Sequence, residues 1–487
     1  MKTIRSLVLL SLAMTLIPCP AQEANPYLGQ KEEKAPVGPS GDSFLTLTEH
    51  VLVPADLLDS WLAGHSMEKD DDASKLRTVV QGWIHDGKAT LDYSALSAGT
   101  VGRVFSNEST LEQLYPTLFM PAPSPEDWMM GTSFESRNLG YGSNGDAVRK
   151  KGELVIRADN ELCKILPHRA PDKVSEETRQ PGDIFLPSFR TFHVKQPPAT
   201  GVDSPNDTSD QEFGESRVRN VPPSYPAGKI HLALRADENL PEPVVKKSPE
   251  DKPENKAPAP LPADRPVRLI FVRSDMTASA PESSDPLPTD YQVSGKMISV
   301  DHRAFSDWLQ GRDLASASRE LSEAIEKWNE DDKVTILRNI SGGGRSGTQT
   351  SLEDTKEVIY PTEWMPGKRE PGSDGKSTQL GLAMACSFET RNVGSTLETD
   401  IQTDEGGPLM LVAFERILHG GFSIHHRVLR DGEWVADITH PRFSCNRWNT
   451  SLRLKRGEWM LIGSGSAFGE NSQFDPTRIV LAFVKVE

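Results

Sequence analysis

The octapeptide SFETRNVG, at residues 387–394, has a near-copy, SFESRNLG, at residues 133–140. Besides the first Ser and the last Gly, the two copies share a Phe, a Glu, an Arg and an Asn: Phe134, Glu135, Arg137 and Asn138 in the first, and Phe388, Glu389, Arg391 and Asn392 in the second. Further matches flank them in the same order: LDSWLAG at 58–64 with FSDWLQG at 305–311, Trp83 with Trp328, and LYPT at 114–117 with IYPT at 359–362. A constant order over several segments predicts that one ancestral unit was duplicated.

The duplication sets the expected domain layout. We call residues 44–275 repeat 1 and residues 291–487 repeat 2. Repeat 1 contains two Pro-rich stretches, which we expect to be disordered because they contain too few apolar residues to offset the entropy of ordering. The remaining predicted segments are a signal peptide at 1–21, a disordered tether at 22–43, the insertions at 196–226 and 237–264, and a linker at 276–290.

The overall charge excludes some classes of partner. The chain has 54 basic and 70 acidic residues, a formal net charge of −16. Non-specific binding to nucleic acid or to an anionic membrane needs a positive surface, so we expect neither nucleic-acid binding nor such membrane binding. Hydrophobic residues make up only 36%, and the chain has 37 Pro and 37 Gly, which favours ordered domains separated by disordered stretches.

The N-terminus has the pattern of an export signal. Lys2 and Arg5 precede an apolar run at residues 7–17, and Cys19 and Ala21 lie at a small-residue cleavage site. The apolar run is about half the ~20 residues that a membrane-spanning helix needs. We therefore expect an exported protein, in the periplasm or associated with the outer membrane, with no transmembrane helix in the mature chain. A lipoprotein that carries its lipid on Cys19 remains an open alternative.

Export implies an oxidising compartment, where cysteines can pair. The mature chain would contain Cys163, Cys386 and Cys445. Cys386 and Cys445 belong to the same repeat, so a disulfide between them and free, semi-buried thiols both remain open.

Each repeat begins with apolar residues at helical spacing. In repeat 2 these lie within 301–311, where Asp301 is the expected N-cap, and then within 321–328; repeat 1 has the same spacing within 54–64 and 76–83. Farther on, apolar and polar residues alternate, which predicts antiparallel strands. The expected fold class is therefore α+β: two tandem repeats, each a helical pair followed by a mainly antiparallel β-sheet, with long disordered insertions.

Repeat 2 resembles the C-terminal domain of the secretins, the outer-membrane ring channels of bacterial secretion and pilus systems. The resemblance rests on YPTEW at 360–364, SFETRNVGSTLETDIQTDEGG at 387–407, TSLRLKRGEWMLIGS at 450–464 and the closing strand RIVLAFVKV at 478–486. Ser346 and the three residues after it stand where the family has an SGQ-like turn. The resemblance implies a β-rich envelope protein with protein partners, and possible oligomers.

One family feature is missing. Secretins have a gate segment of the PLLGDIP kind before the last strand, and residues 465–477 here, GSAFGENSQFDPT, contain no such motif. We therefore expect an exported, non-enzymatic, secretin-like protein that acts as a structural or adaptor component of the cell envelope or a secretion system. A subunit of an outer-membrane secretin channel is one alternative.

The other alternative is a metal-binding protein or an enzyme. His419, His425, His426 and His440 fall within 22 residues, with Asp437 among them, and imidazole and carboxylate are ordinary metal ligands. Their spacing alone brings no three of them together, so we predict no metal, cofactor or catalytic residue. GGGRSGT at 342–348 lacks the Lys of a phosphate-binding loop, and we interpret it as a glycine-rich hairpin turn.

Overall fold

Strands account for most of the described residues in the computed structural model, which places nearly all of them in two large antiparallel sheets. The predicted signal peptide and tether lie outside the described residues up to residue 41, as do nearly all of both insertions and residues 278–288 of the linker. The structure describes residues 42–65, 72–120, 130–150, 153–165, 189–193, 224–237, 265–277, 289–310, 312–367, 369–371, 377–379, 382–404, 406–430 and 433–487.

The expected α+β class is wrong, because the fold is mainly β. The described residues contain four helices, none longer than 17 residues: α1 (Ala55–Ala63), α2 (Ser74–His85), α3 (His302–Leu309) and α4 (Leu314–Glu330). Residues of both predicted repeats contribute strands to the same two sheets, so the sheets dominate the fold. The helices occur where helical spacing predicts them, and the N-cap is confirmed, since Asp301 Oδ1 accepts the Ala304 N–H at 2.7 Å.

Sheet A has eight strands, and its order interleaves the two ends of the chain. Along the sheet the strands are β11 (Val334–Arg345), β10 (Asp290–Asp301), β19 (Phe474–Val486), β18 (Met460–Phe468), β2 (Thr90–Thr100), β1 (Ser43–Pro54), β9 (Pro266–Thr277) and β8 (Ile230–Asp237). Helices α1 and α2 connect β1 to β2, and α3 and α4 connect β10 to β11.

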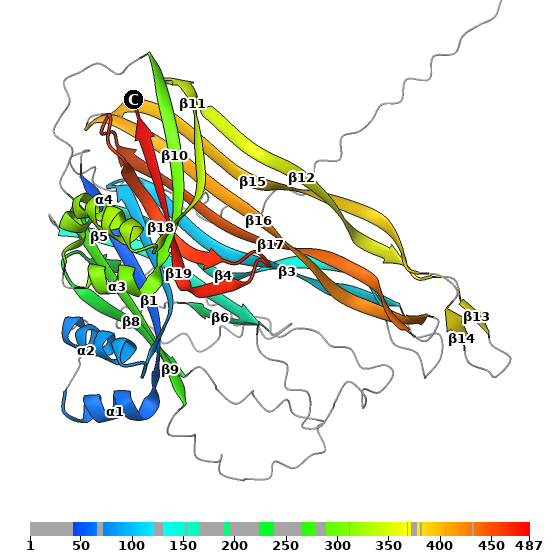
Figure 1. Ribbon diagram of the computed structural model, residues 1–487. Helices are drawn as coiled ribbons and strands as arrows, with labels where there is room; N and C mark the ends of the chain where they lie inside the picture. Colours follow the sequence, from blue (N-terminus) through cyan, green and yellow to red (C-terminus); the bar gives the residue numbers. More distant parts are fainter. Residues whose placement is uncertain are drawn as a thin grey trace, which may run out of the picture. The chain divides into compact units, whose positions relative to one another are not determined.

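Sheet B contains the longest strands, up to 24 residues. Figure 1 shows several of them extending as long ribbons away from the helices. Its order is β12 (Thr350–Met365), β15 (Met384–Asp404), β16 (Gly407–Arg430), β17 (Glu433–Arg453), β3 (Val104–Met120), β4 (Met130–Lys150), β5 (Glu153–Ile165) and β6 (Phe189–His193), with β7 (Ser224–Pro226) on β5. Strands β13 (Arg369–Pro371) and β14 (Ser377–Gln379) form a separate small pair.

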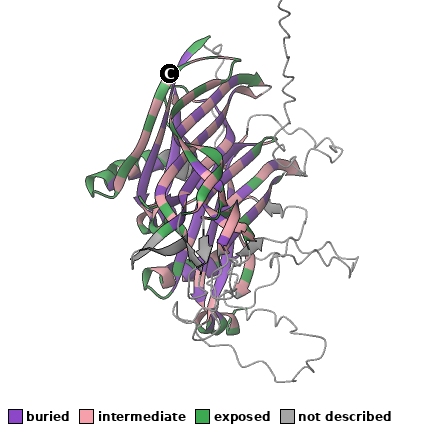
Figure 2. Ribbon diagram, turned by 90° about the vertical axis from the view of Figure 1, so that its right-hand side faces the viewer, coloured by how far each residue is buried: buried purple, intermediate pink, exposed green. Residues whose placement is uncertain are grey.

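The main core lies between the two sheets. Val293 and Leu481 of sheet A pack in one cluster with Phe414 and Trp448 of sheet B, and Phe305 of α3 belongs to the same cluster. In β15, buried and half-buried residues alternate from Val393 to Ile401, and Figure 2 shows the same alternation in other long strands, as expected for strands with one face toward a core. No helix among the described residues is long and apolar enough to cross a membrane.

The glycine run of residues 342–344 is not the hairpin turn that we expected. It belongs to β11, which continues to Arg345 and pairs with β10, and the turn follows at residues 346–349. Neighbouring side chains occupy the space beside two of these glycines: a Cβ at Gly342 would lie 2.5 Å from the Leu352 side chain, and one at Gly344 would lie 2.4 Å from the Tyr291 ring.

Candidate functional site

The two motifs that occur twice in the sequence are cross-strand neighbours in the structure. In the hairpin of β12 and β15, Tyr360 pairs with Glu389 and Pro361 with Phe388. In the hairpin of β3 and β4, Tyr115 pairs with Glu135 and Pro116 with Phe134. The Tyr-Pro-Thr and Ser-Phe-Glu segments are therefore two strands of one hairpin, and the hairpin occurs twice.

Both hairpins contain the same polar contact. The Tyr360 hydroxyl donates to Glu389 Oε2 at 3.1 Å, and the Tyr115 hydroxyl donates to Glu135 Oε2 at 3.5 Å. Burial raises the pKa of Tyr360, and the nearby Glu112 and Glu389 carboxylates raise it further. The Tyr115 pKa is raised by burial first and then by Glu135. Both phenols therefore stay protonated and donate.

The other motif residues differ between the copies. Phe134 is buried, with 6% of its surface exposed, whereas Phe388 is 57% exposed. Asn138 lies opposite Glu112, and Asn392 lies opposite Glu357. The hairpins thus keep the same backbone pairing while their side chains have different surroundings.

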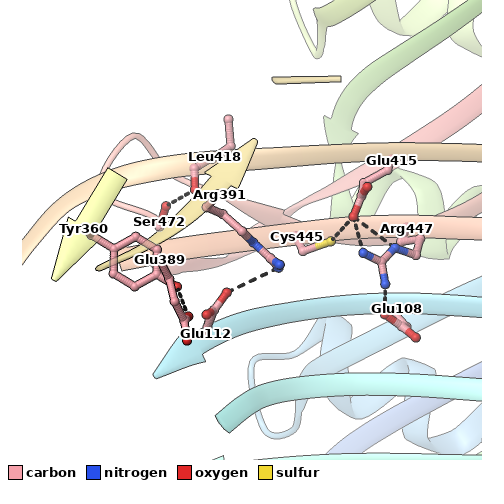
Figure 3. A network of polar contacts seen from close by, with 10 residues as sticks. All are labelled: Glu108, Glu112, Tyr360, Glu389, Arg391, Glu415, Leu418, Cys445, Arg447 and Ser472. Atoms are coloured by element: carbon pink, nitrogen blue, oxygen red, sulfur yellow. Dashed lines mark hydrogen bonds and ion pairs between the residues drawn. The ribbon is translucent and has the colours of Figure 1, made fainter. Parts of the chain in front are cut away.

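The motif arginine of the second hairpin connects it to the first. Arg391 Nη2 lies 3.3 Å from Glu112 Oε2, and the two residues come from β15 and β3, which are not adjacent strands (Figure 3). The Glu112 side chain is only 9% exposed, so its charge is largely withdrawn from water. Arg137, the equivalent in the first hairpin, lies opposite Gln113 and also has a polar partner.

A second polar cluster lies nearby, and no sequence pattern predicted it. Cys445 Sγ donates to Glu415 Oε1 at 3.4 Å, and Arg447 Nε donates to the same oxygen at 3.0 Å (Figure 3). Arg447 also lies 3.4 Å from Glu108 on β3. Burial raises the pKa of the Cys445 thiol, and Glu415 raises it further. This thiol is a weak nucleophile, because the reactive form is the thiolate.

The described cysteines are free thiols: Cys386 is exposed, whereas Cys163 and Cys445 are buried. We expect Cys386 to react with a maleimide in the native protein, and Cys163 and Cys445 to react about 100-fold more slowly until the protein is unfolded. Mass spectrometry of the labelled peptides measures this. A Cys386 that stays unlabelled until a reductant is added would indicate the disulfide that the sequence left open.

Buried Asn and Ser side chains join the two sheets where β2 and β18 lie next to β3 and β17. Asn107 Nδ2 is placed to donate to the Leu96 carbonyl, Ser97 Oγ and the Ser464 carbonyl, at 3.3, 3.1 and 2.8 Å. The backbone pairing of β18 with β2 is limited, among the described residues, to Gly463 and Ser97. Side-chain hydrogen bonds therefore carry much of this junction.

Asn446 makes the matching contacts from β17. Its Nδ2 donates to Ser109 Oγ at 3.0 Å and to the Ser466 carbonyl at 2.9 Å, and Ser109 Oγ also accepts the Ser466 N–H. We call Ser97, Asn107, Ser109, Asn446, Ser464 and Ser466 the polar junction. One sequence signal was available: Asn107 and Ser109 occupy the same alternating positions in β3 as the buried Phe105.

The histidines named as a possible metal site are only partly gathered. The His425 and His440 rings lie 4.9 Å apart, but His419 packs against Phe443 with ring centroids 5.7 Å apart. Asp437 Oδ1 accepts the Ala383 N–H at 2.6 Å. Within the described part of the chain, no three metal-ligating residues converge. The His426 side chain is outside that part.

Comparison with known proteins finds matches among solved structures, and these matches are distant. No protein-family model matches the chain, and no curated protein sequence matches it. Among solved structures, the chain is similar to the secretin InvG of the Salmonella SPI-1 type III secretion injectisome, at 7% identity and a TM-score of 0.19, over 47% of this chain and 73% of that one. The InvG secretin-domain β-barrel matches at 7% identity and a TM-score of 0.21, over 47% and 71%. A basal-body model of InvG, PrgH and PrgK matches at 7% and 0.19, over 47% and 52%. At this identity and TM-score, the likeness assigns the chain to no family.

Proposed function

We propose that this chain is an exported, non-enzymatic structural component of the cell envelope that docks in a larger assembly through a free edge of sheet A. The observation that carries the proposal is strand β11. Among the described strands β11 pairs only with β10, it is 12 residues long, and Ile336 on it is 61% exposed. The unpaired N–H and C=O groups of such an edge can add a strand from a partner.

The strand order supports this role, because the chain already contains edge-to-edge contacts of this kind. In sheet A, the strands of repeat 2 (β11-β10-β19-β18) are followed by those of repeat 1 (β2-β1-β9-β8). In each group the first strand in this order, β11 or β2, follows a helical pair, and the second, β10 or β1, precedes that pair. Sheet B has the same arrangement, with β12-β15-β16-β17 followed by β3-β4-β5-β6. The two repeats thus meet head to tail in both sheets.

A channel subunit is the second candidate, since a head-to-tail contact can in principle continue through further copies. The polar junction favours the adaptor instead. Trp83 and Trp328 match at an offset of 245 residues, and at this offset Ser97, Asn107 and Ser109 correspond to Gly342, Leu352 and Asp354. Leu352 cannot replace the three hydrogen bonds of Asn107. The free edge therefore lacks the groups that join the repeats, which favours a different partner.

Cell fractionation followed by native size measurement tests the proposal. We expect the protein in the envelope fraction, in a complex larger than the 53.6 kDa chain. An Ile336→Lys substitution should move most of it to the soluble fraction while changing Tm by less than about 2 °C, because Ile336 is at the surface. Leu118→Lys is the matched control, since Leu118 is 63% exposed but lies on sheet B.

The other outcomes favour the alternatives. A soluble monomer in every fraction contradicts the structural role. A heat-resistant ring of identical chains favours the channel subunit. Stoichiometric zinc or copper in the purified protein, lost when His425 and His440 are replaced, favours the metal-binding alternative.

A further inference from the structure

Four aromatic rings from three different hairpins meet near the ends of the long strands of sheet B. His440 of β17 is fully buried, and its ring centroid lies 4.2 Å from that of Phe134 on β4, 4.9 Å from that of His425 on β16, and 6.0 Å from that of Trp364 on β12. The Phe134 and His425 rings are 5.2 Å apart. We call these four residues the ring cluster.

The ring cluster lies where backbone pairing between the hairpins has ended. The pairing of β15 with β16 stops at Gly394 and Ile417, and that of β17 with β3 stops at Phe443 and Glu112. Beyond these points the backbone pairing between hairpins is, among the described residues, the single contact of Glu363 with Ser133. Side-chain contacts therefore hold the three hairpins together in this region.

The hydrogen bond within the cluster requires a neutral histidine. Trp364 Nε1 donates to His440 Nε2 at 3.3 Å. An indole N–H can only donate, so His440 Nε2 must be unprotonated to accept it. His425 Nε2 is buried without a hydrogen-bond partner. A proton on either ring would thus place a cation among apolar rings, and on His440 it would also oppose the Trp364 donor.

We propose that the ring cluster is an acid-sensitive latch, which holds the three hairpins together while both histidines are neutral and releases them when His440 and His425 are protonated. This gives the histidine-rich segment a conformational role in place of the metal-binding one that its composition suggested. Release would expose the apolar side chains that the three hairpins now cover, including the buried Phe134.

The direction of the pH dependence follows from burial. Burial lowers the pKa of His440 from 6.5 to about 4; His425 lowers it further, and the Pro361 carbonyl of β12 opposes the shift. Burial alone lowers the pKa of His425 to about 4. Because the folded pKa lies below the unfolded one, the latch contributes its full stability above about pH 6.5 and loses it as the pH falls toward 4.

The surrounding charged groups leave this direction unchanged. On β12 and β4, Glu363 and Glu135 are exposed. On β17, Asp437 accepts the Ala383 N–H, and Arg442 lies two residues after His440. On β16, His419 is itself held at a lowered pKa, by burial first and then by Lys356. No carboxylate among these raises the pKa of His425 or His440.

Hydrogen exchange of the full chain at pH 7.5 and pH 5.0, corrected for the intrinsic exchange rates, tests the latch. A histidine with a pKa of 6.5 when open and about 4 when closed multiplies the opening constant by about 30 at pH 5.0. We expect peptides covering residues 130–140, 359–366 and 433–445 to lose at least about tenfold protection, and residues 460–486 of sheet A to keep theirs. Equal protection of the hairpin peptides at both pH values overturns the proposal.

Variants separate the latch from general acid unfolding. In the His425→Gln/His440→Gln variant, the glutamine at 440 can still accept the Trp364 N–H but does not titrate, so protection should persist at pH 5.0. His65→Gln is the control, since His65 is exposed at the end of α1 and should leave the pH response unchanged. A double variant that loses protection as the wild type does counts against the latch. If that variant is unprotected even at pH 7.5, Trp364→Phe decides: without the donor that opposes protonation of His440, the folded pKa of His440 should rise toward its unfolded value, so the loss of protection between pH 7.5 and pH 5.0 should become smaller. An unchanged loss of protection rejects the proposal.

Discussion

Replacing Gly394 with alanine should destabilise the β12–β15 hairpin by about 3 kcal/mol. Gly394 has a φ of +142°, which side chains rarely adopt, and a Cβ there would lie 2.1 Å from the Asp354 carbonyl oxygen on the neighbouring strand. Two costs therefore add: backbone strain, and separation of two paired strands. This glycine ends the SFETRNVG motif, which explains why the motif contains it.

The first copy of the motif provides an internal test. Gly140 has a φ of +119°, and its Cβ would lie 2.3 Å from the Ser109 carbonyl oxygen, so Gly140→Ala should cost a similar amount. Gly457→Ala is the control for strain alone, because Gly457 has a φ of +78° and nothing lies within 4 Å of its Cβ position. Urea unfolding measures all three. A large effect at Gly394 with none at Gly140 would mean that the two copies are not structurally equivalent.

Local sequence patterns predicted local structure well, but they carried no information about contacts between segments far apart in the chain. The spacing of apolar residues gave the positions of the helices, and Asp301 caps α3 as expected. The fold class was wrong, because nothing within one repeat indicates that its strands continue a sheet begun by the other. Strand β18, for example, lies beside β2, more than 350 residues earlier in the chain. No local sequence pattern predicts a contact between residues so far apart in the chain.

In the candidate site, too, local features could be predicted from the sequence and long-range contacts could not. The repeated Tyr and Glu could be recognised from the sequence, although their direct pairing across a hairpin could not. The ion pair of Arg391 with Glu112 joins two different hairpins, and no spacing in a single sequence couples these positions. Phe134 and Phe388 have nearly the same sequence context, yet one is buried and the other exposed. Identical motifs therefore fix the backbone pairing more closely than they fix the surroundings of the side chains.

A buried ion pair between α2 and β1 gives the other large expected effect. Arg77 is 1% exposed, and its Nε and Nη2 donate to the two carboxylate oxygens of Glu49 at 2.7 and 2.6 Å. Its Nη1 donates to Gln81 Oε1, and Gln81 Nε2 donates to Asp307 of α3, both at 2.7 Å. The network thus connects a helix of the first repeat to a helix of the second, and Arg77 is its centre.

Glu49→Leu should lower the free energy of unfolding by about 3 to 5 kcal/mol, because it leaves the Arg77 guanidinium buried without its carboxylate. The Glu49→Leu/Arg77→Met double variant should recover most of that loss, since a well-packed apolar pair can replace a buried ion pair at little cost. Asp86→Asn is the control: Asp86 pairs with Lys88 at the surface, where water screens the pair and its loss should change the stability little. Chemical denaturation of the four proteins gives the comparison. If Glu49→Leu costs no more than the surface control, water must reach Arg77 in the folded protein, and the connection between the two repeats at α2 and α3 is weaker than its geometry indicates.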